Sequence, residues 1–295
     1  MKQPDFSGVG VALITPFHKH GTVDFTSLGK IVDYIIKNKA DYIVVLGTTG
    51  ETATLTAQEK EAVKNFVIEH VDSRVPVVLG VGGNNTLEVV DKIRNTNFDG
   101  VSGILSVSPY YNKPQQKGIF LHYKNISEIS PVPVIMYNVP GRTGSNISVD
   151  TTLQIASELP NVVATKEASG NINQIMEILR NKPAHFSVIS GDDSLTLPMM
   201  VLGGTGVISV TANAFPKQFA ELMKLCKSGK YKEATAIHYK LLPIMNALFE
   251  EGSPSGVKAA LETLGLCDNN LRLPLVKISK QHHNKINNLI NEINN

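Results

Sequence analysis

Residues 162–190 read VVATKEASGNINQIMEILRNKPAHFSVIS, and this stretch holds the pattern that decides the fold. It begins and ends with short apolar runs, residues 162–166 and 186–190, which are too short for helices and therefore indicate buried parallel strands. Between them, apolar residues recur at helical spacing, at Ile172, Ile175, Ile178 and Leu179. The stretch thus predicts a strand, a helix and a second strand.

The same alternation recurs along most of the chain. Further short runs rich in valine and isoleucine lie at residues 9–15, 42–46, 75–81, 101–107, 132–137 and 206–210. Apolar residues at helical spacing fill residues 28–36, and Thr56 with Glu59 forms a capping box before another helix. Eight strands alternating with helices predict an α/β fold, the (β/α)8 or TIM barrel. An open doubly wound sheet is the alternative, but no Gly-x-Gly-x-x-Gly turn follows the first run.

Strand patterns stop near residue 228, and the rest of the chain has helical patterns alone. Its last segment carries apolar residues at helical spacing, at Ile286, Leu289, Ile290 and Ile293. We therefore expect a (β/α)8 barrel domain over residues 1–228 and a C-terminal α-helical extension over residues 229–295.

The composition argues against several classes of protein. The 295 residues carry 28 lysines and arginines against 26 aspartates and glutamates, a net charge of +2. No dense basic run supports a nucleic-acid partner or a membrane surface, and no apolar run approaches the 18 or so residues that span a bilayer. Only two cysteines occur, Cys226 and Cys267. A disulfide framework is therefore excluded, and a reducing, cytoplasmic compartment is expected.

Lys166 is the sharpest functional candidate, because a barrel enzyme places its active site at the carboxyl ends of the strands. Alternation along the strand puts Lys166 on the same face as Val162 and Ala164, so an inward face would bury its ammonium group. Lysine is rarely buried without a reason. One interpretation is an ion pair with Glu167 or Glu51 at the mouth of the barrel.

The other interpretation is that Lys166 forms a Schiff base with a carbonyl compound. At pH 7 an ordinary lysine is only about 0.04% neutral, which is too little nucleophile. Burial or a nearby cation that lowers the pKa by about 2–3 units would raise the neutral fraction several hundredfold.

Other polar residues also follow predicted strands. Tyr137 could exchange a proton with such an amine, although a lone tyrosine is often only a half-buried aromatic residue. Thr48 and Thr49 stand at a turn whose N–H groups could bind a carboxylate, or they cap a helix. Arg142 has the planar fork that suits a carboxylate, although most loop arginines are simply solvated.

Patterns for metal and nucleotide chemistry are missing. The sequence has no His-Glu-x-x-His, no cysteine pair at metal-binding spacing and no P-loop. His18, His20, His282 and His283 fit solvated loop and tail positions. We therefore expect no metal site and no nucleotide cofactor.

Three segments together resemble one known family. They are Gly47-Thr48-Thr49-Gly50-Glu51, Tyr137-Asn138-Val139-Pro140 and Val162-Val163-Ala164-Thr165-Lys166-Glu167, in that order and at predicted strand ends. They are similar to segments of the pyruvate-dependent class I aldolase family, which includes the dihydrodipicolinate synthases and the N-acetylneuraminate lyases. The likeness runs from about residue 8 to about residue 210.

Two further segments are similar to the synthase branch of this family. Pro109-Tyr110-Tyr111-Asn112-Lys113-Pro114 resembles its loop with a catalytic tyrosine, and Gly141-Arg142-Thr143-Gly144 resembles its arginine turn. An enzyme of the same chemistry with another aldehyde partner is one alternative, and Arg142 argues against it. A non-catalytic binding barrel is the other, and Lys166, Tyr137 and Thr48 together argue against that.

The resemblance implies a mechanism without a cofactor. Lys166 would bind pyruvate covalently as a Schiff base, and Thr48 and Thr49 would hold the pyruvate carboxylate. The resulting enamine would attack L-aspartate 4-semialdehyde, whose carboxylate Arg142 would hold. The product would be 4-hydroxy-tetrahydrodipicolinate, an intermediate of lysine and diaminopimelate biosynthesis.

The resemblance also implies an assembly of identical subunits. Tyr137, Thr48 and Tyr111 would form a proton relay, with Tyr111 reaching into a neighbouring subunit of a homodimer or homotetramer. Gly191 and Ile208 would offer main-chain carbonyl groups to the site.

One departure from the family concerns inhibition by lysine. Lysine-sensitive synthases carry histidines or similar polar groups shortly after the Gly-Thr-Thr-Gly-Glu motif, where this chain has Ala57 and Lys60, although Asn84, Glu88 and Tyr110 match other contacts. Ala57 has no hydrogen-bonding side chain, and Lys60 would repel a cationic amino acid. We expect weak or absent inhibition by lysine.

Overall fold

A computed structural model of the chain describes residues 6–294. Its strands follow one another in chain order as a closed parallel barrel, which confirms the predicted (β/α)8 fold. The strands are β1 (Gly8–Ala12), β2 (Tyr42–Val45), β3 (Val77–Gly80), β4 (Gly103–Val107), β5 (Val134–Asn138), β6 (Val162–Glu167), β7 (Ser187–Ser190) and β8 (Gly206–Ser209). Each coincides with one of the short apolar runs.

The α-helices follow the strands and continue after the last of them. They are α1 (Phe25–Lys37), α2 (Ala57–Val71), α3 (Thr86–Arg94), α4 (Gln116–Ile129), α5 (Pro140–Thr143), α6 (Val149–Glu158), α7 (Ile172–Asn181), α8 (Thr196–Val201), α9 (Pro216–Lys227), α10 (Tyr231–Glu250), α11 (Ser255–Thr263) and α12 (Lys280–Asn294). Short 3₁₀ turns are η1 (Thr48–Gly50), η2 (Thr52–Thr54), η3 (Asp193–Leu195) and η4 (Thr211–Asn213). No helix in the described part of the chain is both long and apolar enough to cross a membrane.

The chain divides into two compact units. The first comprises Pro76–Ile208 with the described residues before Gly8, and the second comprises Gly8–Val75 with the described residues from Ser209 onward. The separate prediction of a boundary between residues 228 and 229 stays a prediction.

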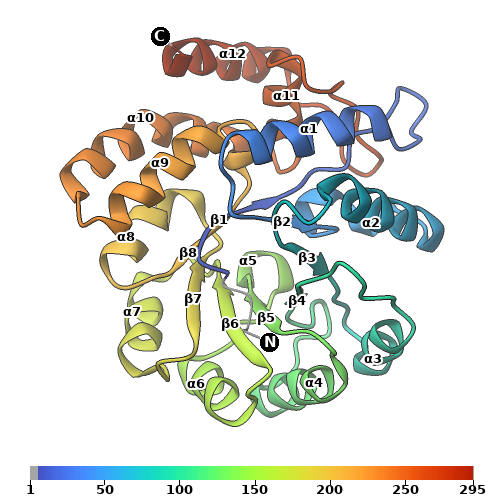
Figure 1. Cartoon of the computed structure of the whole chain (residues 1–295), viewed down its shortest axis with the longest axis vertical. Coiled ribbons are helices and arrows are strands. Elements are labelled where there is room, and N and C mark those ends of the chain that lie inside the picture. Colours follow the sequence, from blue (N-terminus) through green and yellow to red (C-terminus); the bar gives the residue numbers. More distant parts are fainter. Residues whose placement is uncertain (1–5, 295) are drawn as a thin grey trace. The chain divides into compact units, whose positions relative to one another are not determined.

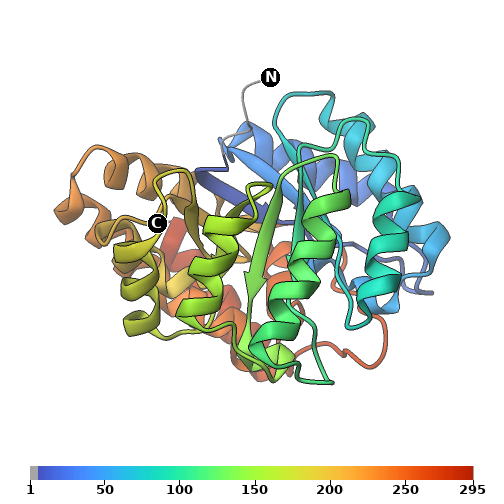
Figure 2. The same ribbon diagram turned by 90° about the horizontal axis from the view of Figure 1, so that it is seen from below.

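The first unit consists of paired parallel strands with helices along their outer side. Its strands pair in sequence from β3 to β8, and Figure 1 shows α3, α4, α6 and α7 outside them. Figure 2 shows that α4 and α6, drawn in green and yellow-green, run lengthwise beside these strands. The predicted apolar face of α7 is confirmed, since Ile175 and Ile178 pack against Val188 of β7. Burial of these apolar helix faces holds the helices against the strands, and this packing fixes the positions of the strand ends.

The second unit pairs β1 with β2 and surrounds them with α1, α2 and the C-terminal helices. The register places Val11 beside Ile43. β1 ends at Ala12 rather than at residue 15, because the Ile14 N–H donates to the side-chain oxygen of Asn213 at 3.2 Å and so leaves the strand ladder. That hydrogen bond joins the first strand to the turn that follows the last strand.

Caps and apolar faces define the helices of the second unit. The capping box of α2 is confirmed, with Thr56 accepting from the Glu59 N–H at 3.2 Å and Glu59 accepting from the Thr56 N–H at 2.9 Å. α12 buries Ile286 and Ile290 on one face, as its spacing predicts. The prediction that His282 is solvated is wrong. It lies on the buried face of α12, with Nε2 at 2.7 Å from the Ala247 carbonyl oxygen.

Candidate active site

Lys166 lies on β6, which pairs with β5 on one side and with β7 on the other. In the sheet register it stands beside Tyr137 of β5 and Ile189 of β7. Only 5% of the residue is exposed, so the ammonium group is buried, as expected if the face it shares with Val162 and Ala164 points inward. Parallel strands buried on both faces leave no water to solvate an ammonium group at this position.

The two carboxylates considered as ion-pair partners of Lys166 are engaged elsewhere. Glu167 accepts hydrogen bonds from the side-chain amide of Asn138 at 3.1 and 3.2 Å, and burial raises the pKa of Glu167. Glu51 forms an ion pair with Lys258. Among the ion pairs between described residues, none involves Lys166. Its burial therefore has no ion-pair explanation in the described chain.

Burial lowers the pKa of Lys166 from 10.5 to about 8. The negative charge of Asp193 opposes this shift, and the positive charge of Arg142 adds to it. The sign follows because desolvation disfavours the charged form of an amine. At pH 7 about a tenth of an amine with this pKa is neutral, against about 0.04% of an ordinary lysine. The amine is therefore available as a nucleophile.

The ring of Tyr137 lies directly beside this amine. The Lys166 Nζ is 4.4 Å from the ring centroid, and Tyr137 is itself buried at the end of β5. A phenol and an amine held this close in a place sheltered from water can pass a proton between them through a substrate atom. The first unit thus brings together the two sequence candidates whose chemistry is complementary.

The turn after β7 brings Gly191 and Asp193 near Lys166. A Cβ atom on Gly191 would lie 2.9 Å from Cε and 3.0 Å from Cγ of Lys166, so glycine lets the lysine stem pass. Asp193 begins η3 and is buried. The sequence reasoning missed Asp193, although two adjacent aspartates directly after a buried strand were a usable signal. Ile208 lies buried on β8.

Arg142 lies on α5, a single helical turn at the end of β5. Pro140 begins this turn, where its missing N–H and fixed φ fit a helix start. Gly144 ends it with a φ of 70°, a value that glycine adopts readily. The side chain of Arg142 is exposed, yet its charge still acts on Lys166. A cation on a short rigid turn near the amine is well placed to meet an anionic substrate.

Tyr111 lies in the loop after β4 and is 88% exposed. Its φ of 72° is uncommon for a residue other than glycine or asparagine. Its N–H donates to the Thr143 carbonyl oxygen at 3.2 Å, which joins this loop to the turn that carries Arg142. The backbone thus presents the phenol to the outside of this chain. Its expected entry into a neighbouring subunit stays a prediction.

Thr48 and Thr49 belong to the second unit, in the 3₁₀ turn directly after β2. Thr48 is exposed and Thr49 is buried. The Gly50 N–H donates to the Gly47 carbonyl oxygen at 3.1 Å, and the Glu51 N–H donates to the Thr48 carbonyl oxygen at 3.2 Å. The cap of α2 is Thr56, so neither threonine of the turn caps that helix. Neither hydroxyl group of the turn takes part in the capping box of α2, which Thr56 and Glu59 form.

The first unit surrounds one buried lysine, whose pKa is lowered, with a phenol and two charges of opposite sign. This arrangement can form a covalent bond to a carbonyl carbon and move the protons that the bond requires. Within residues 6–294, no group of three or more His, Cys, Asp or Glu side chains lies close enough together to hold a metal ion.

Comparison with protein families finds one match over nearly the whole chain. The model of the "Dihydrodipicolinate synthetase family" matches residues 5–293. A 4-hydroxy-tetrahydrodipicolinate synthase from Parabacteroides distasonis is 50% identical over 293 residues, which cover 99% of both chains. A protein of the same name from Flavobacterium psychrophilum is 48% identical over 281 residues, covering 95% of this chain and 96% of the relative.

Solved structures agree with this family. The dihydrodipicolinate synthase of Aquifex aeolicus superposes with a TM-score of 0.94 at 44% identity and covers 98% of each chain. The dihydrodipicolinate synthase of Thermotoga maritima gives a TM-score of 0.96 at 41% identity, covering 98% of this chain and 99% of the other. At these identities the likeness extends beyond the barrel fold alone.

Proposed function

The chain belongs to the dihydrodipicolinate synthetase family, and on this premise we propose that it condenses pyruvate with L-aspartate 4-semialdehyde. The product is 4-hydroxy-tetrahydrodipicolinate, an intermediate of lysine and diaminopimelate biosynthesis. The observation that carries the proposal is the environment of Lys166. Its amine is buried, its pKa is lowered to about 8, and its Nζ lies 4.4 Å from the ring centroid of Tyr137.

The first half of the reaction joins pyruvate to Lys166. The neutral amine attacks the keto carbon, the keto oxygen leaves as water, and a C=N bond forms. Loss of a proton from the methyl group then gives an enamine. Tyr137 carries protons between these species, together with Thr48 and Tyr111. The hydroxyl groups of Thr48 and Thr49 hold the pyruvate carboxylate.

The second half joins the enamine to the aldehyde. The enamine carbon attacks the aldehyde carbon of aspartate semialdehyde, and the aldehyde oxygen takes up a proton to become a hydroxyl group. The amino group of this substrate then attacks the imine carbon, expels the Lys166 amine and closes the ring. Arg142 binds the carboxylate of the aldehyde substrate. The main-chain carbonyl groups of Gly191 and Ile208 accept hydrogen bonds from the substrates.

The enzyme acts as a homodimer or homotetramer in the cytoplasm and uses neither a metal ion nor a nucleotide cofactor. Support for the assembly comes from Tyr111, which is 88% exposed on a loop whose backbone joins the Arg142 turn. A phenol of a proton relay would not stand in water, so a second subunit is expected to cover it.

A two-substrate assay tests the proposed reaction. Pyruvate with aspartate 4-semialdehyde should give product, whereas pyruvate with N-acetylmannosamine should give none. The Lys166→Met variant is the control, because it keeps the length and burial of the side chain and removes the amine. Product from the sugar aldehyde alone would assign the chain to the lyase branch, and product from neither would contradict an enzymatic role.

Feedback by lysine is weak or absent in this enzyme. α2 begins with Ala57, which offers no side-chain hydrogen bond, and Lys60 in the same first turn carries a positive charge. Titration of the two-substrate assay with L-lysine measures the effect. Strong inhibition at physiological lysine concentrations would contradict this proposal.

A further inference from the structure

A buried acidic residue directly follows the turn that carries Thr48 and Thr49. Glu51 has left-handed backbone geometry, with a φ of 52°, which is uncommon for a residue other than glycine. Its side chain is 0% exposed and forms an ion pair with Lys258 of α11, whose side chain is also 0% exposed. A buried carboxylate requires such a partner, because desolvation of an unpaired charge is very unfavourable.

Lys258 is itself fixed by further contacts. Its Nζ donates to the Asn270 carbonyl oxygen at 2.9 Å and lies 4.2 Å from the ring centroid of Phe17. Neighbours on α11 that are small or apolar exclude water from it. The ammonium group is therefore a rigid anchor for Glu51 rather than a mobile counterion.

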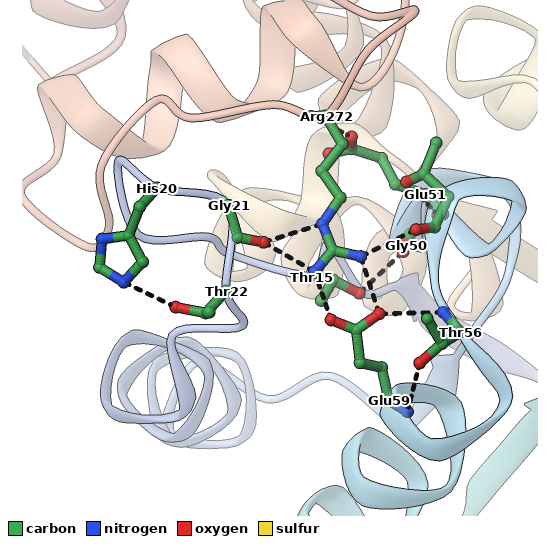
Figure 3. A network of polar contacts seen from close by, with 10 residues as sticks. Thr15, His20, Gly21, Thr22, Gly50, Glu51, Thr56, Glu59 and Arg272 are labelled. Atoms are coloured by element: carbon green, nitrogen blue, oxygen red, sulfur yellow. Dashed lines mark hydrogen bonds and ion pairs between the residues drawn. The ribbon is translucent and has the colours of Figure 1, made fainter.

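Arg272 binds the same segment at further points. Its backbone N–H donates to the Glu51 carboxylate at 3.2 Å, and its guanidinium donates to the Thr54 carbonyl oxygen at 2.8 Å. Figure 3 shows this guanidinium between the Gly21 carbonyl group and the carboxylate of Glu59, with which it forms an ion pair. Arg272, which follows α11 in the chain, thus holds the segment from Glu51 to the start of α2.

A neutral hydrogen bond supports the turn from another direction. The Thr15 hydroxyl group donates to the Gly50 carbonyl oxygen at 2.8 Å, also visible in Figure 3. Hydrogen bonds and ion pairs between charged groups are about twice as strong as neutral ones. Glu51, which contacts Lys258 and accepts from the Arg272 N–H, is therefore a charged group that ties the end of the turn to the C-terminal part of the second unit.

We propose that Glu51 and Lys258 are positioning residues that fix the turn of Thr48 and Thr49 for binding the carboxylate of the keto-acid substrate. This inference rests on the proposed function, in which the two threonines hold that carboxylate. Neither charged group needs to touch the substrate, because Glu51 directly follows the turn and acts through the backbone of the turn. Misplacement of a positioning group by about 1 Å can reduce a rate on the order of 10²-fold.

Charge-removing variants separate positioning from stability. Lys258→Met leaves a buried carboxylate unpaired, whereas the double variant Glu51→Gln with Lys258→Met removes both charges and leaves neither uncompensated. Lys64→Met is the matched control, because Lys64 of α2 is also a buried lysine of the second unit, and it forms an ion pair with Glu61.

The first readout is the pyruvate concentration at which half of the protein forms a pyruvate adduct that borohydride traps. We expect it to rise at least about tenfold in Lys258→Met and in the double variant, with the final extent of adduct at saturating pyruvate retained. Lys64→Met should match the wild-type protein. A double variant that recovers thermal stability together with wild-type pyruvate dependence would overturn the inference and leave the pair a purely structural contact.

The second readout needs no substrate. Amide hydrogen exchange in the segment of Gly50 and Glu51 should be at least about tenfold faster in Lys258→Met and in the double variant, and unchanged in Lys64→Met. Unchanged exchange there would overturn the positioning role whatever the adduct shows. Absence of any pyruvate adduct in the wild-type protein would instead overturn the proposed function, so the two failures are distinguishable.

Discussion

Two buried lysines in this protein lie in similar surroundings and differ in one respect. Lys166 has its Nζ 4.4 Å from the ring centroid of Tyr137, and Lys258 has its Nζ 4.2 Å from that of Phe17. Lys258 also forms an ion pair with Glu51, while the described chain offers Lys166 no carboxylate at ion-pair distance. An aromatic ring beside a buried amine is therefore not what distinguishes a structural lysine from a reactive one.

The two amines differ in the carboxylate that opposes the effect of burial. Burial lowers the pKa of both lysines. At Lys258 the ion pair with Glu51 opposes this shift, whereas Lys166 belongs to none of the ion pairs between described residues and the charge of Asp193 opposes the shift there. A buried lysine is therefore expected to become a nucleophile where it has no ion-pair partner.

The largest expected effect is an opposite change in stability at the two lysines. Lys166→Met should abolish adduct formation and raise the free energy of unfolding at pH 7 by about 3 kcal/mol, because it removes an amine whose pKa falls from 10.5 to about 8 on folding. This gain should shrink as the pH rises from about 8 to about 10.5, where the unfolded chain also loses the proton. Lys258→Met should instead lower the free energy of unfolding by about 3–5 kcal/mol, since it leaves Glu51 unpaired.

Denaturant unfolding of both variants, with Lys64→Met as a common control, measures these changes. A loss of stability in Lys166→Met as large as that in Lys258→Met would mean that both lysines are structural.

The next effect concerns Arg142, whose charge lowers the pKa of Lys166 as that of Arg272 lowers the pKa of Lys258. Arg142→Ala should leave the pyruvate adduct intact and slow condensation with aspartate semialdehyde about 10- to 150-fold, because hydrogen bonds to charged groups contribute roughly 1.5–3 kcal/mol. Arg142→Lys keeps the charge, loses the planar fork and should recover only part of the rate. Stopped-flow kinetics measure the rate of adduct formation and the rate of condensation separately. Equal loss of both steps would assign Arg142 to the fold or to pyruvate binding.

The smallest effect is a shift of the pH profile of adduct formation. At low pyruvate the rate should rise about tenfold from pH 6 to pH 7 and level off above about pH 8, following the neutral fraction of Lys166. Asp193→Asn removes a charge that raises the pKa of Lys166, so its profile should move to lower pH, whereas Arg142→Ala should move it to higher pH. Initial rates of cyanoborohydride trapping measure both shifts. If the pH profiles of both variants coincide with that of the wild-type protein, the charges of Asp193 and Arg142 do not affect the pKa of Lys166.

Local patterns were sufficient to predict the barrel and the position of Lys166. The strands were readable because each is a short run of apolar residues, buried on both faces and bounded by helical spacing. Lys166 was identified because a lysine lies at the carboxyl end of such a run, next to Glu167. The capping box of Thr56 and Glu59 was readable for the same reason, since its two hydrogen bonds join residues three positions apart.

Contacts between distant segments could not be predicted in this way. Lys258 stands in a helix among small and apolar residues, which signals burial but does not identify Glu51 as its partner. His282 was assigned to solvent because its neighbours in the sequence are polar, yet packing of α12 places it against the carbonyl group of Ala247. The effect of the Asp193 charge on Lys166 could not be predicted in this way, because it depends on the pairing of β6 with β7.

The most direct test of this account is borohydride reduction in the presence of pyruvate, followed by mass-spectrometric mapping of every lysine-containing peptide. We expect one pyruvate-derived group on Lys166 and none on Lys258, although both amines are buried beside aromatic rings. A modified Lys258, or an unmodified Lys166 under conditions that label another lysine, would contradict it.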